Sequence, residues 1–163
     1  MEDVKIIEYE EKYLEDVKDL FVELEEYLVS IDQDNLDRVH EDYRETYTKI
    51  ALNEFKEEDG KCYLAIKDNK AIGLIIGTIP KYDKYDYLDY KCPKRGCITE
   101  LIVTSKVRSN GIGQALIDKI DEYFKSKDCE YVIVDIFAYN DSAMKFYFKK
   151  GFHPRMVTGI KKI

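Results

Sequence analysis

Between an apolar, strand-like run and an amphipathic, helix-like run lies Val107-Arg108-Ser109-Asn110-Gly111-Ile112-Gly113-Gln114. Its two glycines let the backbone turn tightly and approach a ligand with no Cβ in the way. The helix that follows directly offers its first N–H groups and the positive end of its dipole. This order predicts a cradle for pyrophosphate, although glycine-rich turns of this kind also serve packing alone. The loop lacks the Gly-Lys-Ser/Thr of a Walker loop and the third glycine of the dinucleotide fingerprint.

Apolar periodicity on either side of this loop predicts a mixed α/β fold. The runs 98–104 and 131–137 are apolar enough to be buried strands, and 111–126 has helical spacing between them. Two such strands joined through a helix imply a parallel pair with a right-handed crossover. The remaining pattern predicts a strand at 4–9, helices at 11–29 and from Asp34 onward, strands at 62–66 and 71–79 around a turn at 68–70, an irregular segment at 81–96, a helix at 142–149 and a strand-like tail from Phe152. The second helix would carry the apolar stripe Leu36, Val39, Tyr43, Tyr47 and Ile50.

The length of 163 residues suits one domain, residues 1–163, and 45% hydrophobic residues are enough for a packed core. No apolar run reaches the roughly 18 residues of a membrane span, and the acidic N-terminus lacks a secretory pattern. Four cysteines without such a pattern predict reduced thiols in a cytoplasmic protein. Because the chain has only two histidines, and Cys92 and Cys97 stand five residues apart, we expect no zinc site and no other metal.

Charge is distributed unevenly along the chain. Residues 1–60 carry 21 acidic and 7 basic side chains, a net charge of −14, whereas residues 61–163 carry +7, which together give −7. Such a chain can hold an anionic ligand on its basic part and attract a cationic one to its acidic part. Acids on the solvated faces of two helices would give the same pattern. The overall negative charge disfavours nucleic acid as a partner.

Two motifs resemble the GCN5-related N-acetyltransferase (GNAT) superfamily. Arg108-Ser109-Asn110-Gly111-Ile112-Gly113 is similar to the family signature R/Q-x-x-G-x-G/A, and residues 140–152 are similar to N-x-x-A-x-x-x-Y-x-x-x-G-F at every marked position. The strand-like runs 63–66 and 73–75 also resemble the second and third strands of the family. The chain departs from the usual Arg-Gly-Lys/Arg-Gly stretch, which removes one basic residue near the phosphates.

The resemblance implies a GNAT fold, a mixed sheet flanked by helices, with acetyl-CoA as acyl donor and a primary amine as acceptor. In that family the glycine loop holds the pyrophosphate, which implies cofactor contacts for Arg108, Ser109, Asn110, Gly111, Ile112, Gly113 and Gln114. The pantetheine arm would lie beside the backbone of Ile102 and Val103, much as an added strand would. Asn140 resembles the family asparagine that hydrogen-bonds the cofactor arm, and it would also suit a helix cap.

Acetyl transfer to an amine needs a base, a donor for the developing oxyanion and a proton for the leaving thiolate. Tyr147 matches the tyrosine of the second motif, which implies that it protonates the thiolate. Glu100 and Asp135 are carboxylates in otherwise apolar strand-like runs, where partial burial would raise the pKa toward that of a general base. The resemblance favours Glu100, while Asp135 matches an acid in some protein-acetylating members, so both remain candidates.

The basic part of the chain would then bind CoA, and the acidic helices together with 81–96 would form the acceptor side. This split favours a cationic acceptor: a polyamine, an aminoglycoside, an amino acid, a protein N-terminus or a lysine side chain. Within 81–96, Asp83, Asp86 and Asp89 alternate with tyrosines that suit a cationic amine, or the segment is an extension that packs on itself. Two other functions stay open, a non-catalytic acyl-CoA sensor and an enzyme for a longer acyl group. No membrane partner is expected, and a homodimer is left open.

Overall fold

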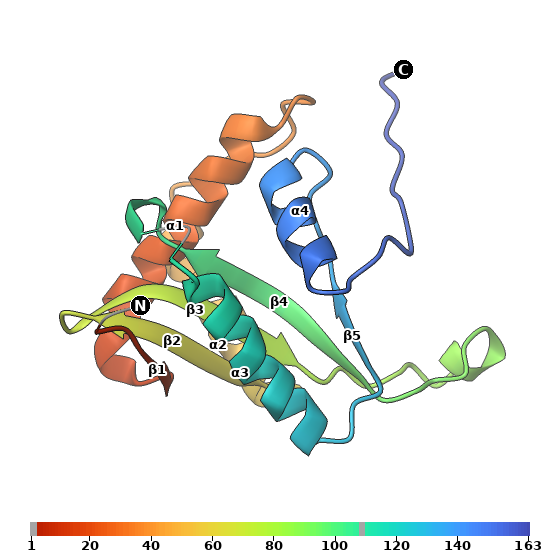
Figure 1. The fold of residues 1–163 in the computed structure, drawn as a ribbon. Helices are drawn as coiled ribbons and strands as arrows, with labels where there is room; N and C mark the ends of the chain where they lie inside the picture. The colour runs from red at the N-terminus through yellow and green to blue at the C-terminus, as the bar shows by residue number, and fades with distance from the viewer. Residues whose placement is uncertain (1–2, 108–109) are drawn as a thin grey trace.

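The computed structural model describes residues 3–107 and 110–163 (Figure 1). Arg108 and Ser109, predicted above to contact phosphate, lie outside the described residues. The elements in chain order are β1 (Lys5–Glu8), a 3₁₀ turn (Glu11–Tyr13), α1 (Leu14–Ile31), α2 (Tyr43–Glu57), β2 (Lys61–Lys67), β3 (Lys70–Thr78), a 3₁₀ turn (Asp86–Leu88), β4 (Arg95–Val103), a 3₁₀ turn (Ser105–Val107), α3 (Ile112–Ser126), β5 (Tyr131–Val134) and α4 (Asp141–Lys149). No helix within the described ranges is both long and apolar enough to cross a membrane.

The strands form one mixed sheet in the order β1-β2-β3-β4-β5. Strands β1 to β4 pair antiparallel, and β5 pairs parallel with β4 after the crossover helix α3. The turn between β2 and β3 consists of Asp68 and Asn69, whose φ angles of 49° and 58° are those of a type I′ hairpin. The mixed sheet, the parallel pair and the hairpin confirm the predictions made from the sequence.

Helices cover both faces of the sheet, and each face has its own apolar core (Figure 1). On one face, α1 buries Val17 and Phe21 in a core that we call the α1 core. On the other face, α3 buries Leu116 and Phe124 in the α3 core, to which α4 contributes Tyr147. The helical spacing of these apolar residues places them on one side of each helix, so their burial holds the three layers together.

The second helix begins at Tyr43 rather than after Asp34, so the prediction of a helix capped by Asp34 is wrong. The carboxylate of Asp32 accepts hydrogen bonds from three backbone N–H groups between residues 34 and 37, which satisfies these donors without a helix. Leu36 is 67% exposed and Val39 is also exposed, so the first part of the expected apolar stripe packs against no core. Residues 32–42 instead form an exposed connection between α1 and α2.

Two of the strand predictions also need correction. Strand β5 ends at Val134 rather than at residue 137, because its ladder with β4 stops at the pair Ile98–Val134. Residues 153–163 form no strand and are exposed, with Met156 86% exposed. A strand-like composition does not form a strand unless another strand supplies its hydrogen bonds.

Candidate active site

A β-bulge in the middle of β4 positions the central side chain of the site. Strand β3 pairs with β4 at Glu100 and next at Ile98, so Thr99 is an extra residue with no β3 residue opposite it. The bulge divides β4 between the two layers: Ile98 belongs to the α3 core, whereas Ile102 belongs to the α1 core. Glu100 pairs with Ile76 of the α1 core and therefore faces α1 and α2. Bulges redirect side chains in this way beside functional sites.

Glu100 is a buried carboxylate, only 7% exposed. The hydroxyl of Tyr47 on α2 donates a hydrogen bond to its Oε1. Burial raises the pKa of Glu100 to about 7; the Tyr47 hydrogen bond opposes this rise, and the charges of Glu54 and Glu25 add to it. At neutral pH both protonation states of Glu100 are therefore populated, which suits a group that accepts and releases a proton.

Tyr147 of α4 is the second buried polar group at this place. Burial raises the pKa of Tyr147, and the negative charge of Glu100 raises it further by a smaller amount. Its ring packs edge-on against Phe146 and Phe152, with centroids 5.4 Å away in each case. A raised pKa keeps the phenol protonated at neutral pH, so the group can donate a proton or a hydrogen bond. The structure thus brings the predicted acid close to one of the two predicted bases.

Asp135, the other candidate base, lies in a different environment. The prediction that it sits within a buried strand is wrong, because β5 ends at Val134 and Asp135 is exposed. An exposed carboxylate keeps its hydration and lacks the burial on which the prediction rested. Glu100 is the better candidate on this ground.

Strands β4 and β5 diverge next to Glu100. They pair from Arg95–Tyr131 to Ile98–Val134, after which β4 continues to Val103 and the chain beyond β5 turns toward α4 (Figure 1). An extended ligand can add to a strand edge of this kind through main-chain hydrogen bonds.

Ile102 and Val103 lie in this last part of β4. The Ile102 side chain is buried in the α1 core, and the Val103 side chain packs against the α3 core. Both side chains thus pack inside the protein, so a cofactor contact here would use the main chain. The prediction for these two residues concerned their backbone groups, and it stays a prediction.

The glycine loop leads directly into α3. Gly111, the N-cap residue of α3, has a φ of 76°, which lies in the left-handed region that favours glycine, and it has no side chain with which to cap the helix. The side-chain amide of Asn110 donates to the carbonyl oxygen of Val107 at 3.3 Å. A Cβ atom on Gly113 would meet Phe146 at 3.5 Å, which is ordinary contact. Packing within the chain therefore does not require glycine at position 113.

The other two predicted phosphate contacts in α3 have side chains that are already engaged. Ile112 is buried in the α3 core, and the side-chain amide of Gln114 donates to Asp118. Their backbone N–H groups stand in the first turn of the helix, where no intrahelical acceptor exists. Any contact of Ile112 or Gln114 with an anion would thus involve the backbone.

Asn140 caps α4, as the sequence suggested for this position. Its Oδ1 accepts from the backbone N–H of Ala143 at 3.1 Å and from the hydroxyl of Ser142 at 2.9 Å. The hydroxyl of Tyr27 on α1 also lies 3.5 Å from this oxygen. The cap is confirmed, whereas a contact between Asn140 and the cofactor stays a prediction.

A neighbouring contact places the α1–α2 connection beside the site. The hydroxyl of Tyr139, in the segment between β5 and α4, donates to the carboxylate of Asp34 at 2.8 Å. The exposed connection 32–42 therefore lies next to the segment that leaves β5. Its exposed acids are Asp34, Asp37, Glu41 and Asp42.

Glu23 is a candidate that sequence reasoning missed. From α1 its carboxylate accepts from the Thr104 hydroxyl at 2.8 Å and from the backbone N–H of Ser105 at 2.6 Å. Thr104 and Ser105 follow β4 and lead into the glycine loop, so this contact attaches the loop to α1. Tyr47 was missed in a similar way, since the sequence marked it only as part of an apolar stripe.

The segment 81–94 precedes the start of β4 at Arg95, where β5 is still paired with β4 (Figure 1). Its contacts are largely local: the Tyr82 hydroxyl donates to the carbonyl oxygen of Pro93 at 2.8 Å, and Asp86 accepts from the backbone N–H of Asp83 at 2.6 Å. This location is away from the diverging part of β4. The prediction that its acids contact the acceptor stays a prediction, and the connection 32–42 lies closer to the site.

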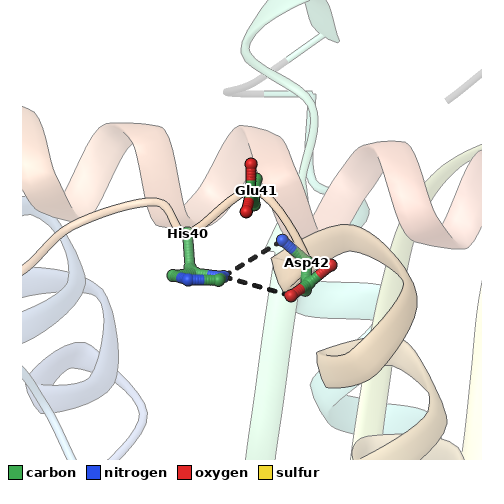
Figure 2. Close-up of side chains that lie close together, drawn as sticks. All are labelled: His40, Glu41 and Asp42. Atoms are coloured by element: carbon green, nitrogen blue, oxygen red, sulfur yellow. Dashed lines mark hydrogen bonds and ion pairs between the residues drawn. The ribbon is translucent and has the colours of Figure 1, made fainter.

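Three consecutive residues, His40, Glu41 and Asp42, could offer ligand atoms within 4.8 Å of one another to a metal ion (Figure 2). All three are exposed, and Nδ1 of His40 accepts a hydrogen bond from the backbone N–H of Asp42 at 3.2 Å. Neighbours in an exposed turn lie together without any ion. We assign this group no metal-binding role.

Comparison with known proteins shows the family to which this chain belongs. The model of the acetyltransferase (GNAT) family matches residues 16–152. The chain belongs to this family. The match includes Glu100, Tyr147 and the glycine loop, so the features described above lie within the GNAT region.

Similar proteins bear related names. An uncharacterised N-acetyltransferase of Methanocaldococcus jannaschii is 28% identical over 127 residues, which are 74% of this chain and 74% of that protein. Human N-alpha-acetyltransferase 30 is 33% identical over 91 residues, 56% of this chain but only 23% of the human protein. A solved structure from Pyrococcus furiosus, described as an acetyl transferase, covers 99% of this chain and all of its own, with a TM-score of 0.73 at 20% identity. This last likeness confirms the GNAT fold.

Proposed function

We propose that this GNAT-family protein transfers the acetyl group of acetyl-CoA to a primary amine. The observation that carries the proposal is the buried Glu100 carboxylate, which lies where β4 and β5 diverge. Its negative charge helps to raise the pKa of Tyr147. The pKa of Glu100 is raised to about 7, so it can accept a proton, while the raised pKa of Tyr147 keeps a proton available. Two groups whose environments set such different pKa values are typical of acid–base catalysis.

Acetyl-CoA would supply an activated acetyl thioester. Glu100 accepts a proton from the ammonium group of the acceptor, directly or through water, because only the neutral amine has a lone pair. A bond then forms between the amine nitrogen and the acetyl carbon, and the carbon–sulfur bond breaks. Tyr147 donates its proton to the leaving sulfur, and it regains the proton that the new amide nitrogen loses.

The start of α3 fits the pyrophosphate of CoA. Neither Gly111 nor Gly113 has a side chain to cover the backbone, and the N-cap residue Gly111 offers no cap of its own, so the first N–H groups of the helix would face an incoming anion. Ile112 and Gln114 would contribute backbone N–H groups, because their side chains are engaged within the protein. The remaining loop residues with this role are Arg108, Ser109 and Asn110.

The pantetheine arm would lie along the part of β4 that runs beyond its last pair with β5. The main chain of Ile102 and Val103 would form hydrogen bonds with it, as in β-augmentation. Asn140 caps α4, which follows β5, and would face the same arm from the side of β5. The thioester would then lie between Glu100 and Tyr147.

The acceptor would approach from the side of α1 and α2. Glu100 faces these helices, and the acidic connection 32–42 lies beside the segment that leaves β5. A rim of exposed carboxylates favours a cationic amine. Because a curated relative is named N-alpha-acetyltransferase 30, a peptide α-amine is the first acceptor to test. Polyamines, aminoglycosides, amino acids and lysine side chains come next.

The test is thiol release from acetyl-CoA across a panel of these amines, with mass spectrometry of the products. We expect at least one amine to give an acetylated product, and Glu100→Gln to abolish the acidic limb of the pH–rate profile for that amine. Propionyl-CoA and butyryl-CoA in parallel reactions would identify a preference for a longer acyl group. Tight binding of acetyl-CoA with no turnover of any amine would refute the proposal in favour of an acyl-CoA sensor.

A further inference from the structure

Tyr47 is held in place by two aromatic neighbours. Its ring stacks on that of Tyr43, with centroids 4.8 Å apart and planes 8° apart, and it meets Phe21 edge-on at 5.3 Å and 83°. Tyr43 and Tyr47 stand one helical turn apart on α2, the spacing at which side chains on a helix meet. The hydroxyl of Tyr43 interacts with Glu25 of α1. These contacts fix the direction in which the Tyr47 hydroxyl points.

Among the described residues, none of the groups that interact electrostatically with Glu100 is a positively charged side chain. These groups come from each element packed around it: Glu25 of α1, Tyr43, Tyr47 and Glu54 of α2, Cys62 of β2 and Tyr147 of α4. Burial and the two glutamates disfavour the charged carboxylate, whereas the hydrogen bond from Tyr47 favours it. The Tyr47 hydroxyl is thus the contact in this group that stabilises ionised Glu100.

We propose that Tyr47 is a positioning residue for Glu100: its hydroxyl holds the carboxylate in one orientation and favours the ionised form that accepts the proton. The inference rests on the proposed function of Glu100 as the base. Tyr47 acts through Glu100. Part of the base site therefore lies on α2, a helix outside both sequence motifs.

Removal of the hydroxyl has a defined chemical consequence. In Tyr47→Phe the ring and its stacking remain, but the ionised carboxylate is buried without its donor. Glu100 therefore keeps its proton up to a higher pH than in the wild type. Hydrogen bonds to charged groups are strong enough to account for an upward shift of about one to two pH units. A 3,5-difluorotyrosine at position 47 is a stronger donor, since fluorine makes the phenol more acidic, and it should produce a downward shift.

The experiment compares Tyr47→Phe with Tyr43→Phe, which removes the neighbouring hydroxyl and also keeps the stack. The first readout is the ¹³C NMR titration of the Glu100 side-chain carboxyl, assigned by its loss in Glu100→Gln; it needs neither CoA nor an acceptor. The second is the acidic limb of kcat/KM once an acceptor is known. We expect Tyr47→Phe to move both midpoints upward by about one to two pH units, and Tyr43→Phe to move them by less than half of that.

An unmoved NMR midpoint in Tyr47→Phe would overturn the proposal. If Tyr47→Phe does not fold, the difluorotyrosine protein decides the matter, since an unmoved midpoint there overturns it equally. Failure of the proposed function looks different: Glu100→Gln would retain the acidic limb, whatever the NMR titration shows. Loss of the limb in Glu100→Gln together with unmoved midpoints in Tyr47→Phe would refute the positioning role alone.

Discussion

Replacing Glu100 by Gln tests the centre of the site without knowledge of the acceptor. Gln has nearly the same shape and can still accept the hydrogen bond from Tyr47, but it cannot ionise. Above the ordinary pKa of a carboxyl group, folding of the wild-type protein must either bury the charge of Glu100 or bind a proton there, and both cost free energy. The substitution removes this unfavourable contribution, so its effect on stability must depend on pH.

The size of the effect follows from the pKa. Burial raises the pKa of Glu100 from 4.5 to about 7. Because the folded-state pKa is the higher one, the folded protein holds the proton more tightly. The stability from this group is therefore complete below pH 4.5 and is lost as the pH rises through 7. Between pH 5 and pH 8, the free energy of unfolding should fall by roughly 2.5 kcal/mol more in the wild type than in Glu100→Gln.

Urea unfolding of both proteins at several pH values between 5 and 8, followed by circular dichroism, measures this difference. Groups that do not interact with Glu100 contribute equally to the pH dependence of both proteins and cancel. Asp135→Asn is the matched control, because it replaces an exposed carboxylate at the end of the neighbouring strand. A difference between wild type and Glu100→Gln that stays constant within about 0.5 kcal/mol would refute the reasoning that makes Glu100 the base.

Three further changes test the cofactor side and the acid. Gly113→Ala should leave the fold as stable or up to about 1 kcal/mol more stable, since helices favour alanine and the new Cβ meets only ordinary contacts. It should nevertheless weaken CoA binding several-fold in calorimetry, unlike Gly159→Ala in the exposed tail; unchanged affinity would separate the loop from phosphate binding. Tyr147→Phe should lower kcat by roughly 10²–10⁴-fold with CoA affinity nearly unchanged, and an unaltered kcat would exclude it as the acid. Glu23→Ala should raise the Kd for CoA more than Thr104→Val does, because it removes the contacts of Glu23 with both Thr104 and Ser105; equal Kd values would contradict this.

The parts of the fold that the sequence predicted well are those with local causes. The glycine loop before α3, the crossover between β4 and β5, and the turn at Asp68 and Asn69 each depend on residues that are neighbours in the chain. The predictions were wrong where an element forms only if it can pack against, or pair with, a distant part of the chain. The stripe from Leu36 to Val39 had the right spacing for a helix but no core to cover, and the tail after Phe152 had strand-like residues but no strand to pair with.

The contacts within the site were beyond sequence reasoning for a related reason. The hydrogen bond from Tyr47 to Glu100 joins residues 53 apart, and that from Thr104 to Glu23 joins residues 81 apart. No spacing rule connects a helix position to a strand so far along the chain. Motif resemblance selected Tyr147 and favoured Glu100, but it has no means of selecting Tyr47, the residue on α2 that hydrogen-bonds the proposed base.

Because of the bulge at Thr99, the alternation of side chains along β4 predicts the wrong face of the sheet for Glu100. In a regular strand Ile98, Glu100 and Ile102 would share one face, because side chains alternate with a period of two. The extra residue transfers Glu100 and Ile102 to the α1 face, while Leu101 packs against the α3 core. Glu100 therefore faces the acidic helices at the point where β4 passes beyond β5, and Tyr147 reaches the same point from the α3 side. One inserted residue thus lets the proposed base and the proposed acid come from opposite layers of the sheet, which suits the proposed approach of an amine and a thioester from opposite sides.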